Sequence, residues 1–342
     1  MEMSQMTCSD FPLTGQAIHG NLERCPPVNR ADLRADMPKL LTYVLITPAR
    51  NEAQFIELTI KSVVSQTIRP HKWVIVSDGS TDGTDDLVSK YAVEHPWIEL
   101  VRMPEHRERH FAAKIHAFNA GYARIQEVKY DAIGSLDGDI SFDENYFCFL
   151  LQKLKEDATL GLVGTPFTDR SMDAYDYRFV GIDHVSGCCQ LFRRQCFEDI
   201  GGYVPLKTGG VDLLAVTSAR MKGWKTRTFT EKMCWHHRTI GTAQHSTLIA
   251  SFRTGVKDYH FGGHPLWELL RAIYQMSRRP FLLGGVLLGT GYLWAMVRRE
   301  ERPISPEVVE FRRHDQMLRL RRFWLRLGCV QCRKSFGEGP RR

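Results

Sequence analysis

The sequence lacks the features that mark a secreted, disulfide-bonded protein. Its nine cysteines are odd in number and irregularly spaced, and the polar first 40 residues contain no run typical of a signal peptide. Both observations favour reduced thiols in a cytoplasmic protein. Cys329 and Cys332 have zinc-knuckle spacing, but no second Cys or His pair lies nearby to complete four ligands, which argues against zinc. Cys188 and Cys189 are predicted to fill space in the core.

The body of the chain also lacks net charge. The formal charge over 342 residues is +7, and residues 298–342 alone hold 13 Lys and Arg against 6 Asp and Glu. A neutral body gives no indication of a nucleic-acid partner, whereas the basic tail favours contact with anionic lipid or another polyanion. Apolar residues at 43% and charged residues at 25% are ordinary for a globular protein and exclude wholesale disorder.

From residue 42, apolar strand-like runs alternate with segments of helical periodicity. The predicted strands cover residues 42–47, 73–77, 98–102 and 130–136, and the predicted helices cover 52–66, a segment N-capped near Thr84, and 111–125. Alternation every 25–30 residues or so predicts an α/β fold with a Rossmann-like, mostly parallel sheet flanked by helices. We expect a flexible arm over 1–40, a catalytic domain over 41–240 with halves 41–140 and 141–240, and a helical, basic region over 241–342.

Polar clusters follow three of the predicted strands. They are Pro48–Glu52, Asp78 and Asp137–Asp139. Since ligands on parallel sheets bind at the carboxyl ends of the strands, these clusters are expected to share one rim. Two carboxylates separated by Gly138 can converge on one divalent ion, and their oxygens suit Mg²⁺ or Mn²⁺. The alternative for that tripeptide is a solvated Asp-Gly turn.

Taken in order, these motifs resemble the family 2 glycosyltransferases of the GT-A fold. The matching pieces are Pro48-Ala-Arg-Asn-Glu52, Val76-Ser-Asp-Gly-Ser-Thr-Asp-Gly-Thr84, Lys114 with Asn119-Ala-Gly121, Leu136-Asp-Gly-Asp139, and Gly187-Cys-Cys-Gln-Leu-Phe-Arg-Arg194 followed by Gly201-Gly-Tyr203. The resemblance covers residues 42–240. It implies a metal-dependent, inverting transferase of the membrane-associated bacterial polysaccharide type, which uses a nucleotide-diphosphate sugar.

The resemblance also assigns the nucleotide-sugar to the first rim residues, Pro48, Arg50, Glu52 and Asp78. Asp78 matches the carboxylate that accepts a hydrogen bond from the nucleotide base, with a turn-forming role as the alternative. Arg50 stands where many relatives carry an aromatic that stacks on uracil, and its guanidinium plane can stack there too, so a UDP-sugar is favoured. Glu52 binds ribose or favours the positive end of the following helix.

The diphosphate and the metal are assigned to residues further along. The resemblance implies that Asp139 binds the metal directly and that Asp137 binds the ribose or the same ion. Lys114 neutralises a carboxylate or a phosphate unless it is a plain surface lysine. One imidazole of His236 and His237 completes the metal shell, and the sequence does not distinguish which. Arg238 grips the diphosphate.

Asp212 is the candidate general base. In the family this residue is usually the Asp of a Glu-Asp pair ahead of a helix, and Val211 stands here in place of the Glu. The alternative is that Asp212 serves only as the N-cap of a helix over residues 213–221.

Two segments of the last quarter favour a membrane. Residues 280–297 carry no charge, and as a helix they are about 27 Å long. A segment dipping into one leaflet is the first expectation, a true span the second and a buried core helix the third. A helix from Ser305-Pro306 to Gly328 carries one stripe of Met317, Leu320, Trp324 and Leu327 and another of Arg319, Arg322 and Arg326. It lies at a membrane surface or packs on the catalytic body.

These features together predict an enzyme on the cytoplasmic face of the cell membrane with a lipid-linked or polysaccharide acceptor. Three other functions compete with this one. They are a sugar-nucleotide nucleotidyltransferase, a phosphohydrolase that uses Asp137 as nucleophile, and a non-catalytic membrane adaptor. The first requires a Gly-rich, Arg-containing loop after the first strand, which Pro48–Glu52 is not. The second places its aspartates after the first strand, whereas three strand-helix units precede them here.

Overall fold

The computed structural model describes residues 41–105, 111–168, 181–238, 247–278 and 280–335. The side chains of Phe111, Thr247 and residues 326–335 are outside that description. The chain divides into units of residues 1–39 and 40–342. The predicted arm over 1–40 and the side chains of Cys329 and Cys332 therefore lie outside the described part.

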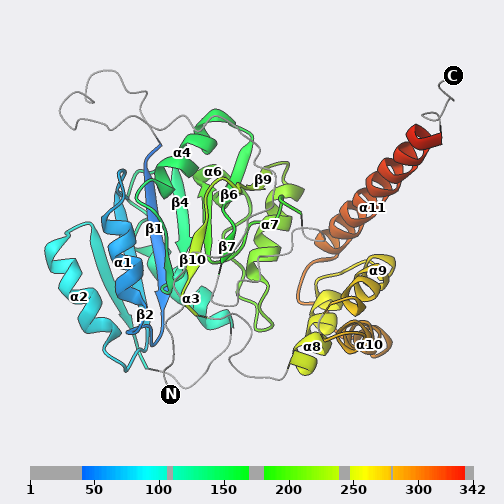
Figure 1. The fold of residues 1–342 in the computed structure, drawn as a ribbon. Coiled ribbons are helices and arrows are strands. Elements are labelled where there is room, and N and C mark those ends of the chain that lie inside the picture. Colours follow the sequence, from blue (N-terminus) through cyan, green and yellow to red (C-terminus); the bar gives the residue numbers. More distant parts are fainter. Residues whose placement is uncertain (1–40, 106–110, 169–180, 239–246, 279, 336–342) are drawn as a thin grey trace, which may run out of the picture. The chain divides into compact units, whose positions relative to one another are not determined.

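A seven-stranded sheet forms the centre of the unit 40–342 (Figure 1). Its strand order is β3-β2-β1-β4-β8-β6-β9, and β1, β2, β3 and β4 run parallel while β8 is antiparallel to both neighbours. The bounds are β1 Tyr43–Ala49, β2 Lys72–Asp78, β3 Ile98–Met103, β4 Ala132–Leu136, β6 Leu160–Gly164, β8 Cys189–Arg193 and β9 Lys225–Thr228. The predicted α/β class and mostly parallel sheet are confirmed.

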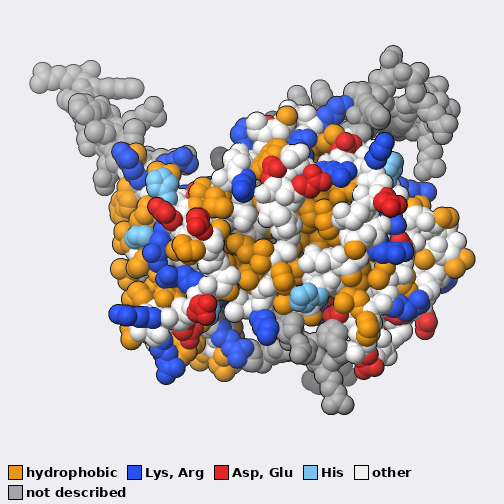
Figure 2. Space-filling model, turned by 180° about the vertical axis from the view of Figure 1, so that it is seen from behind, with side chains coloured by type: hydrophobic (Ala, Val, Ile, Leu, Met, Phe, Trp, Pro, Cys, Tyr) orange, Lys and Arg blue, Asp and Glu red, His pale blue; other side chains and the backbone are white. Residues whose placement is uncertain are grey.

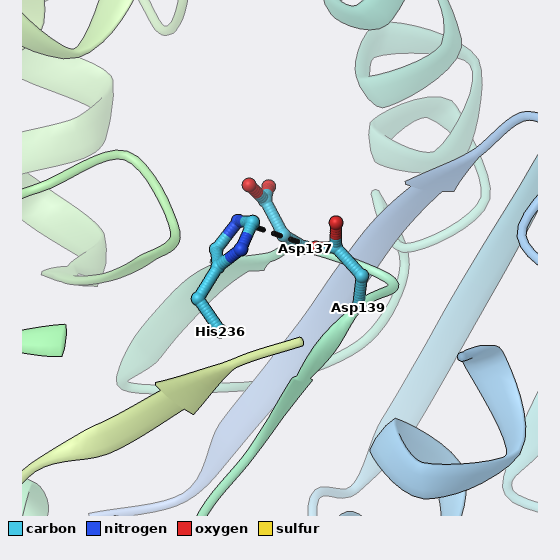
Figure 3. A group of neighbouring side chains, drawn as sticks. All are labelled: Asp137, Asp139 and His236. Atoms are coloured by element: carbon cyan, nitrogen blue, oxygen red, sulfur yellow. Dashed lines mark ion pairs between the residues drawn. The ribbon is translucent and has the colours of Figure 1, made fainter. Parts of the chain in front are cut away.

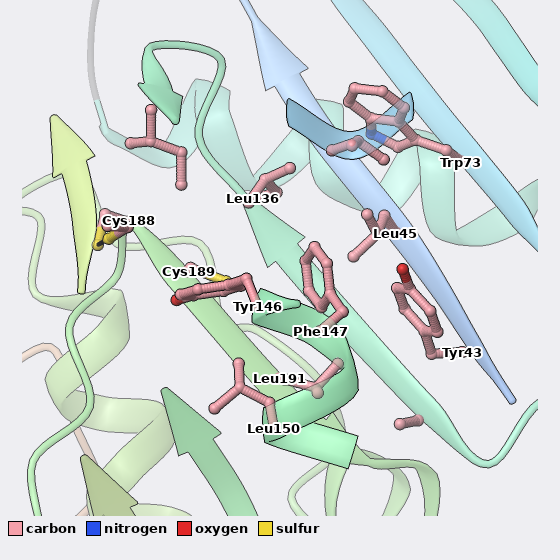
Figure 4. Packing of buried hydrophobic residues seen from close by; sticks show 14 of the residues in the cluster. Tyr43, Leu45, Trp73, Leu136, Tyr146, Phe147, Leu150, Cys188, Cys189 and Leu191 are labelled. Atoms are coloured by element: carbon pink, nitrogen blue, oxygen red, sulfur yellow. Dashed lines mark hydrogen bonds between the residues drawn. The ribbon is translucent and has the colours of Figure 1, made fainter. Parts of the chain in front are cut away.

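Helices cover both faces of this sheet because strand side chains alternate between the two faces. Leu45 and Trp73 pack with α1 (Ile56–Val64), α2 (Thr84–Glu94) and α4 (Tyr146–Glu156) on one face (Figure 4). Val44, Ile46 and Val74 pack with α3 (Phe111–Ala123), α6 (Arg194–Asp199) and α7 (Val211–Met221) on the other. Cys188 and Cys189 are buried and form no disulfide, which confirms their predicted role as core residues.

The structure explains why the Asn119-Ala-Gly121 motif ends in glycine. A Cβ at Gly121 would lie 2.7 Å from Ile46 Cγ2 and 2.9 Å from Val76 Cγ2. Helix α3 therefore approaches the sheet closely only because residue 121 has no side chain. This close approach sets the height at which Lys114, two turns earlier on α3, reaches the rim of the sheet.

A second, three-stranded sheet begins just after β4 in the chain. It consists of β5 (Ile140–Ser141), β10 (Cys234–His236) and β7 (Phe167–Thr168), with β10 in the middle. Strand β10 pairs antiparallel with β5 so that His236 lies opposite Ile140. This pairing brings a segment almost 100 residues away in the chain against the residue that follows Asp139.

In the described part of the C-terminal region there are four helices, namely α8 (Thr247–His260), α9 (Pro265–Met276), α10 (Leu283–Val297) and α11 (Pro306–Ser335). Glycines on α10 face α8 and α9, since a Cβ at Gly291 would lie 2.1 Å from Phe252 O and one at Gly285 2.2 Å from Ala272 O. Of the three expectations for residues 280–297, packing within the protein holds for this face of α10. Within the described ranges, no helix has both the length and the apolar character needed to cross a bilayer.

Helix α11 differs from its prediction in two ways. It continues through Gly328 to Ser335, so the predicted end at Gly328 is wrong. Its arginine stripe is also divided. Arg319 Nε donates to Asp315 at 2.9 Å, whereas Arg322 and Trp324 are exposed. The first half of α11 therefore packs one face, with Val308, Val309 and Gln316 buried, whereas every described side chain from 321 to 325 is exposed.

Candidate active site

The polar clusters predicted after three strands do share one rim. Strands β2, β1 and β4 are adjacent and parallel, and they end at Asp78, Ala49 and Leu136. Pro48 lies in β1 opposite Val76, and the loop that carries Arg50 and Glu52 follows directly. Asp78 is 4% exposed, and Arg50 Nη1 lies 3.7 Å from its carboxylate. Arg50 is thus held beside Asp78.

Asn51, which the sequence analysis did not single out, joins two of these loops. It adopts a left-handed conformation at φ 55°, which is uncommon for a residue other than glycine. Its amide N–H donates to Ser80 Oγ at 3.1 Å, and its side-chain oxygen accepts from the Thr81 N–H at 2.9 Å. The loop after β1 is therefore fixed to the loop after β2. The positive φ of Asn51, which marks the role of this residue, is visible only in the structure and not in the sequence.

The entry to α2 is built differently from its prediction. Gly83 is the N-cap, and Thr84 is the first helical residue. The buried Thr84 hydroxyl donates to Asp82 at 2.6 Å and accepts from the Glu52 N–H at 2.9 Å. The prediction that Thr84 is the N-cap of α2 is therefore wrong. Thr84 instead positions Glu52 at the rim.

Asp137, Asp139 and His236 converge at the end of β4 (Figure 3). One potential ligand atom from each residue lies within 4.8 Å of the others, and His236 Nε2 is 3.5 Å from Asp139 Oδ1. Asp139 and His236 are each 7% exposed. His236 Nδ1 lies 2.5 Å from the Arg238 carbonyl oxygen, so Nδ1 carries the proton and Nε2 presents its lone pair to the carboxylates.

His237 is placed differently from its neighbour. Its ring Nε2 lies 2.9 Å from Ser141 Oγ, and the ring stacks on Phe55 with centroids 6.2 Å apart. Its backbone N–H donates to the Asp139 carbonyl at 2.8 Å. The structure thus brings His236, and not His237, to the two carboxylates. Alternation of side chains along β10 and the following residue explains why adjacent histidines point apart.

Cationic side chains pair with the carboxylates of the rim. Lys114 Nζ lies 2.5 Å from Asp137 Oδ1, and Arg238 Nη2 donates to Glu52 Oε2 at 2.6 Å. Arg238 Nε is also 3.5 Å from Asp139 Oδ2. Lys114 and Arg238 are therefore already directed at the carboxylates of the rim.

Burial, together with neighbouring carboxylates, raises the pKa of two of these groups, Glu52 and Asp137. Burial raises the pKa of Glu52 to about 7, with Asp139 adding to the shift and Arg238 opposing it. Burial likewise raises the pKa of Asp137, although Lys114 opposes the shift. The pKa of Lys114 is itself raised, because attraction to the carboxylates outweighs the opposing effect of burial. An added positive charge would relieve this crowding.

Asp212 lies in the first turn of α7 and not at its N-cap, which is Gly210. The alternative prediction, in which Asp212 serves only as the N-cap, is therefore wrong. Its Oδ2 lies 3.8 Å from Nε2 of the buried His184, a residue that the sequence analysis missed. Asp212 also contributes to the raised pKa of Lys114, so its charge acts on the same site as Asp137.

Comparison with known proteins defines the class. Residues 44–201 match the model of the family described as Glycosyl transferase family 2. This segment is under half of the chain, and its match confirms the resemblance that the motifs predicted.

Two curated relatives have more specific names than the family. The chain is 24% identical over 272 residues to poly-beta-1,6-N-acetyl-D-glucosamine synthase of Staphylococcus aureus strain COL, covering 70% of this chain and 62% of that protein. It is 22% identical over 209 residues to the synthase of the same name in Staphylococcus epidermidis, covering 56% and 47%. The chain thus spans less than two thirds of the length of these curated relatives.

Among solved structures, the fold resembles that of a mannosyltransferase from Pyrobaculum calidifontis in complex with GDP-Man and Mn²⁺. The TM-score is 0.50 with 20% identity over 79% of this chain and 78% of that chain. The GT-A fold predicted from the motifs is confirmed.

Proposed function

We propose that this chain is a metal-dependent, inverting glycosyltransferase. It moves a sugar from a nucleotide-diphosphate sugar, with UDP favoured, to a hydroxyl of a lipid-linked or polysaccharide acceptor. The convergence of Asp137, Asp139 and His236 at the rim of the sheet carries this proposal. The names of the curated relatives, which are polysaccharide synthases, support a saccharide acceptor.

The residues present fit a divalent cation. Two carboxylates and a neutral imidazole form a mixed oxygen and nitrogen set, which suits Mn²⁺ or Mg²⁺ better than a soft metal. The raised pKa of Asp137 reflects burial and a neighbouring carboxylate, which a cation would compensate. A cation held by Asp137, Asp139 and His236 supplies charge neutralisation for the diphosphate leaving group.

The remaining rim residues bind and orient the donor. Asp78 accepts a hydrogen bond from the nucleotide base, and Arg50, held 3.7 Å from it, lies against the same group. Pro48 and Glu52 border the ribose. Lys114 and Arg238 exchange their carboxylate partners for diphosphate oxygens when the donor binds.

Asp212 accepts the proton of the acceptor hydroxyl as that oxygen attacks the anomeric carbon. Direct displacement forms the new glycosidic bond as the bond to the nucleotide diphosphate breaks, so one base suffices and no covalent sugar-enzyme step is needed. His184, 3.8 Å from Asp212, restricts the orientation of this carboxylate.

A thermal-shift screen with UDP-, GDP- and dTDP-sugars, each with and without Mn²⁺, tests donor and metal together. A UDP-sugar at 100 times its dissociation constant is expected to stabilise the protein by about 2.7 kcal/mol, and only with Mn²⁺ present. Asp139→Asn is expected to abolish this shift. Asp143→Asn, which removes an exposed carboxylate paired with Lys232, serves as the matched control and is expected to retain the ligand-induced shift.

An equal shift in the Asp139→Asn protein, or none in any protein, would contradict the proposal. The released product provides a second measurement. Free nucleotide diphosphate is expected after sugar transfer, whereas pyrophosphate would identify a nucleotidyltransferase instead.

Peripheral attachment to a membrane is part of the proposed function. In the described ranges, 22 large hydrophobic side chains are more than a third exposed, and 16 of them lie within residues 248–325. On the face shown in Figure 2, exposed hydrophobic side chains lie among Lys and Arg side chains, with Asp and Glu side chains also present. Apolar side chains beside basic ones are typical of helices that lie at an anionic membrane surface.

Vesicle co-sedimentation tests this attachment. Replacing Phe323 and Trp324, which are 56% and 59% exposed, by serine is expected to reduce binding to anionic vesicles several-fold. Val93→Ser, on a side chain that is 84% exposed on α2, is the control and is expected to bind as before. Unchanged binding of the double variant would place the attachment elsewhere.

A further inference from the structure

A second cavity lies behind Asp212, separate from the three residues of the metal cluster. Its volume is about 290 Å³, enough for roughly ten water molecules at about 30 Å³ each. It is lined by the loop before β8 and by α7, α8, α9 and α11. No role in donor binding accounts for it, because its lining includes none of the rim residues from Pro48 to Asp139.

One face of α7 connects this cavity to the proposed base. Asp212, Val216 and Arg220 all line it, at the four-residue spacing that places side chains on one side of a helix. From Asp212 to Arg220 the helix rises about 12 Å. A ligand in the cavity can therefore present a hydroxyl to Asp212 while its other end lies against residues deeper along α7.

The lining is rich in cations. Five cationic side chains contribute to it, namely Arg220, Lys257, Arg271, Arg312 and Arg319. Four carboxylates contribute too, namely Asp183, Asp212, Asp258 and Asp315. Most of the guanidinium groups are paired with these carboxylates, as Arg220 is with Asp315 at 2.6 and 2.8 Å. The cavity wall is therefore pre-organised and carries a small excess of positive charge.

Lys257 is the cation that this network does not pair. Within the described ranges no carboxylate lies within 4.0 Å of its ammonium group, whose nearest recorded partner is the face of Phe261 at 6.0 Å. Its side chain runs past Gly210, where a Cβ would lie 2.9 Å from Lys257 Cε, and thus past the start of α7. The ammonium group is accordingly available on the side of the cavity where α7 begins and Asp212 lies.

The electrostatic field in the cavity is consistent with an anionic ligand. Burial lowers the pKa of His184, and Arg312, Arg319 and Lys257 lower it further although Asp212 opposes them. His184 is therefore neutral at pH 7, so the positive charge of the cavity comes from its Arg and Lys side chains. Planar guanidinium groups and an ammonium group match the tetrahedral oxygens of a phosphate.

We propose that this cavity binds a phosphate group of the acceptor and thereby presents the acceptor's hydroxyl to Asp212. The binding itself is independent of the function proposed above, whereas its role in acceptor selection depends on that function. Lys257 is the residue that determines specificity for the phosphate. Three of the helices that line the cavity also carry the exposed apolar side chains, so a phosphate carried by a lipid is one source and a phosphorylated glycan the other.

Binding of octyl β-D-glucoside 6-phosphate to the full chain, measured by titration calorimetry in EDTA, tests the proposal. EDTA removes the divalent cation on which donor binding depends. The phosphorylated probe is expected to bind at least tenfold more tightly than octyl β-D-glucoside and to weaken as salt is added. Lys257→Met, which retains the apolar stem, is expected to weaken it about tenfold, and Lys257→Glu further. Lys222→Met, at the exposed far end of α7, is the control.

Equal affinity for the phosphorylated and neutral probes, or unchanged affinity in both Lys257 variants, would overturn the proposal. Methyl β-D-glucoside 6-phosphate separates the two sources, because a lipid-borne phosphate predicts tighter binding of the octyl compound and a glycan phosphate predicts equal binding. Asp139→Asn is expected to lose UDP binding in Mn²⁺ while it keeps the phosphate probe. Failure of donor binding alone would count against the proposed function and not against this cavity.

Discussion

Charged side chains are arranged differently at the rim of the sheet and among the C-terminal helices. At the rim, Glu52, Asp137 and Asp139 crowd together, and burial with the nearby Asp139 raises the pKa of Glu52 to about 7. Beside α11, Asp315 accepts two hydrogen bonds from Arg220, and its pKa is lowered against the opposing effect of burial. Carboxylates with fixed guanidinium partners stabilise packing, whereas crowded carboxylates are typical of a site that receives a cation.

The largest expected effect concerns Asp212, which lies where these two regions meet. Asp212→Asn is expected to reduce sugar transfer at least about a hundredfold, because general-base catalysis typically contributes 10²–10⁴-fold. Affinity for UDP in Mn²⁺ is expected to remain within a factor of about two, since the variant leaves Asp137, Asp139 and His236 unchanged. Steady-state release of nucleotide diphosphate and calorimetric titration of UDP measure the two quantities.

Asp86→Asn is the matched control, because Asp86 is an exposed carboxylate in the first turn of α2. A first-turn carboxylate contributes about 0.3–1 kcal/mol through the helix dipole, so both variants are expected to lose that much stability. If Asp212→Asn and Asp86→Asn reduced the rate of sugar transfer equally, Asp212 would have only a structural role in its helix. It would then not belong to the reactive site at the rim.

Much of the rim was predictable because it depends on local sequence. Apolar runs fixed the positions of β1, β2 and β4, and the rule that ligands bind at carboxyl strand ends placed Asp78 and Asp139 together. The choice between His236 and His237 was not predictable. It depends on the pairing of β10 with β5, a contact between residues almost 100 positions apart that leaves no periodic signal in either strand.

The C-terminal helices were harder to predict for a different reason. A glycine-rich apolar run has the same sequence pattern whether it faces lipid or a neighbouring helix. Only the structure shows that α10 packs on α8. Gly328 looked like a helix end, yet α11 continues past it. Propensity is a weak signal that the surrounding helix overrides. The cavity beside Lys257 also escaped notice, since its lining comes from five separate segments.

Two glycine substitutions sharpen the comparison by testing how tightly the helices pack. A Cβ at Gly255 would lie 1.9 Å from Leu288 O and 2.8 Å from Tyr292 N, both backbone atoms that cannot rotate away. Gly255→Ala is therefore expected to destabilise the protein by about 1–3 kcal/mol. At Gly289 the nearest atom is Ala272 Cβ at 3.6 Å, an ordinary contact. Gly289→Ala is expected to stabilise α10 by up to about 1 kcal/mol.

The midpoints of urea unfolding measure both changes. The Gly289 variant is the control for the first, because both substitutions add the same methyl group to a helix of the same region. A Gly255→Ala protein as stable as the wild type would mean that α8 and α10 separate easily. The helices would then resemble a mobile attachment more than the packed scaffold that the comparison describes.

The smallest expected effect concerns Glu268 and Asp258, two carboxyl groups among the C-terminal helices that are crowded as those at the rim are. Burial, with Asp258 adding to it, raises the pKa of the 2%-exposed Glu268 to about 8. Between pH 4.5 and 8 the folded protein therefore holds a proton that the unfolded chain releases, so stability falls as the pH rises through this range. The slope is at most about 1.4 kcal/mol per pH unit and levels off above pH 8.

Glu268→Gln keeps this position neutral at every pH, so it is expected to flatten the slope and to raise stability at pH 8. Glu310→Gln, on an exposed carboxylate of α11, is expected to keep the slope. Urea unfolding at pH 5, 6.5 and 8 distinguishes these outcomes. If the slope persisted in Glu268→Gln but disappeared in Glu52→Gln, the pH-sensitive proton would reside at the rim. Crowded carboxylates would then be confined to the rim, and the C-terminal helices would contain only compensated charge.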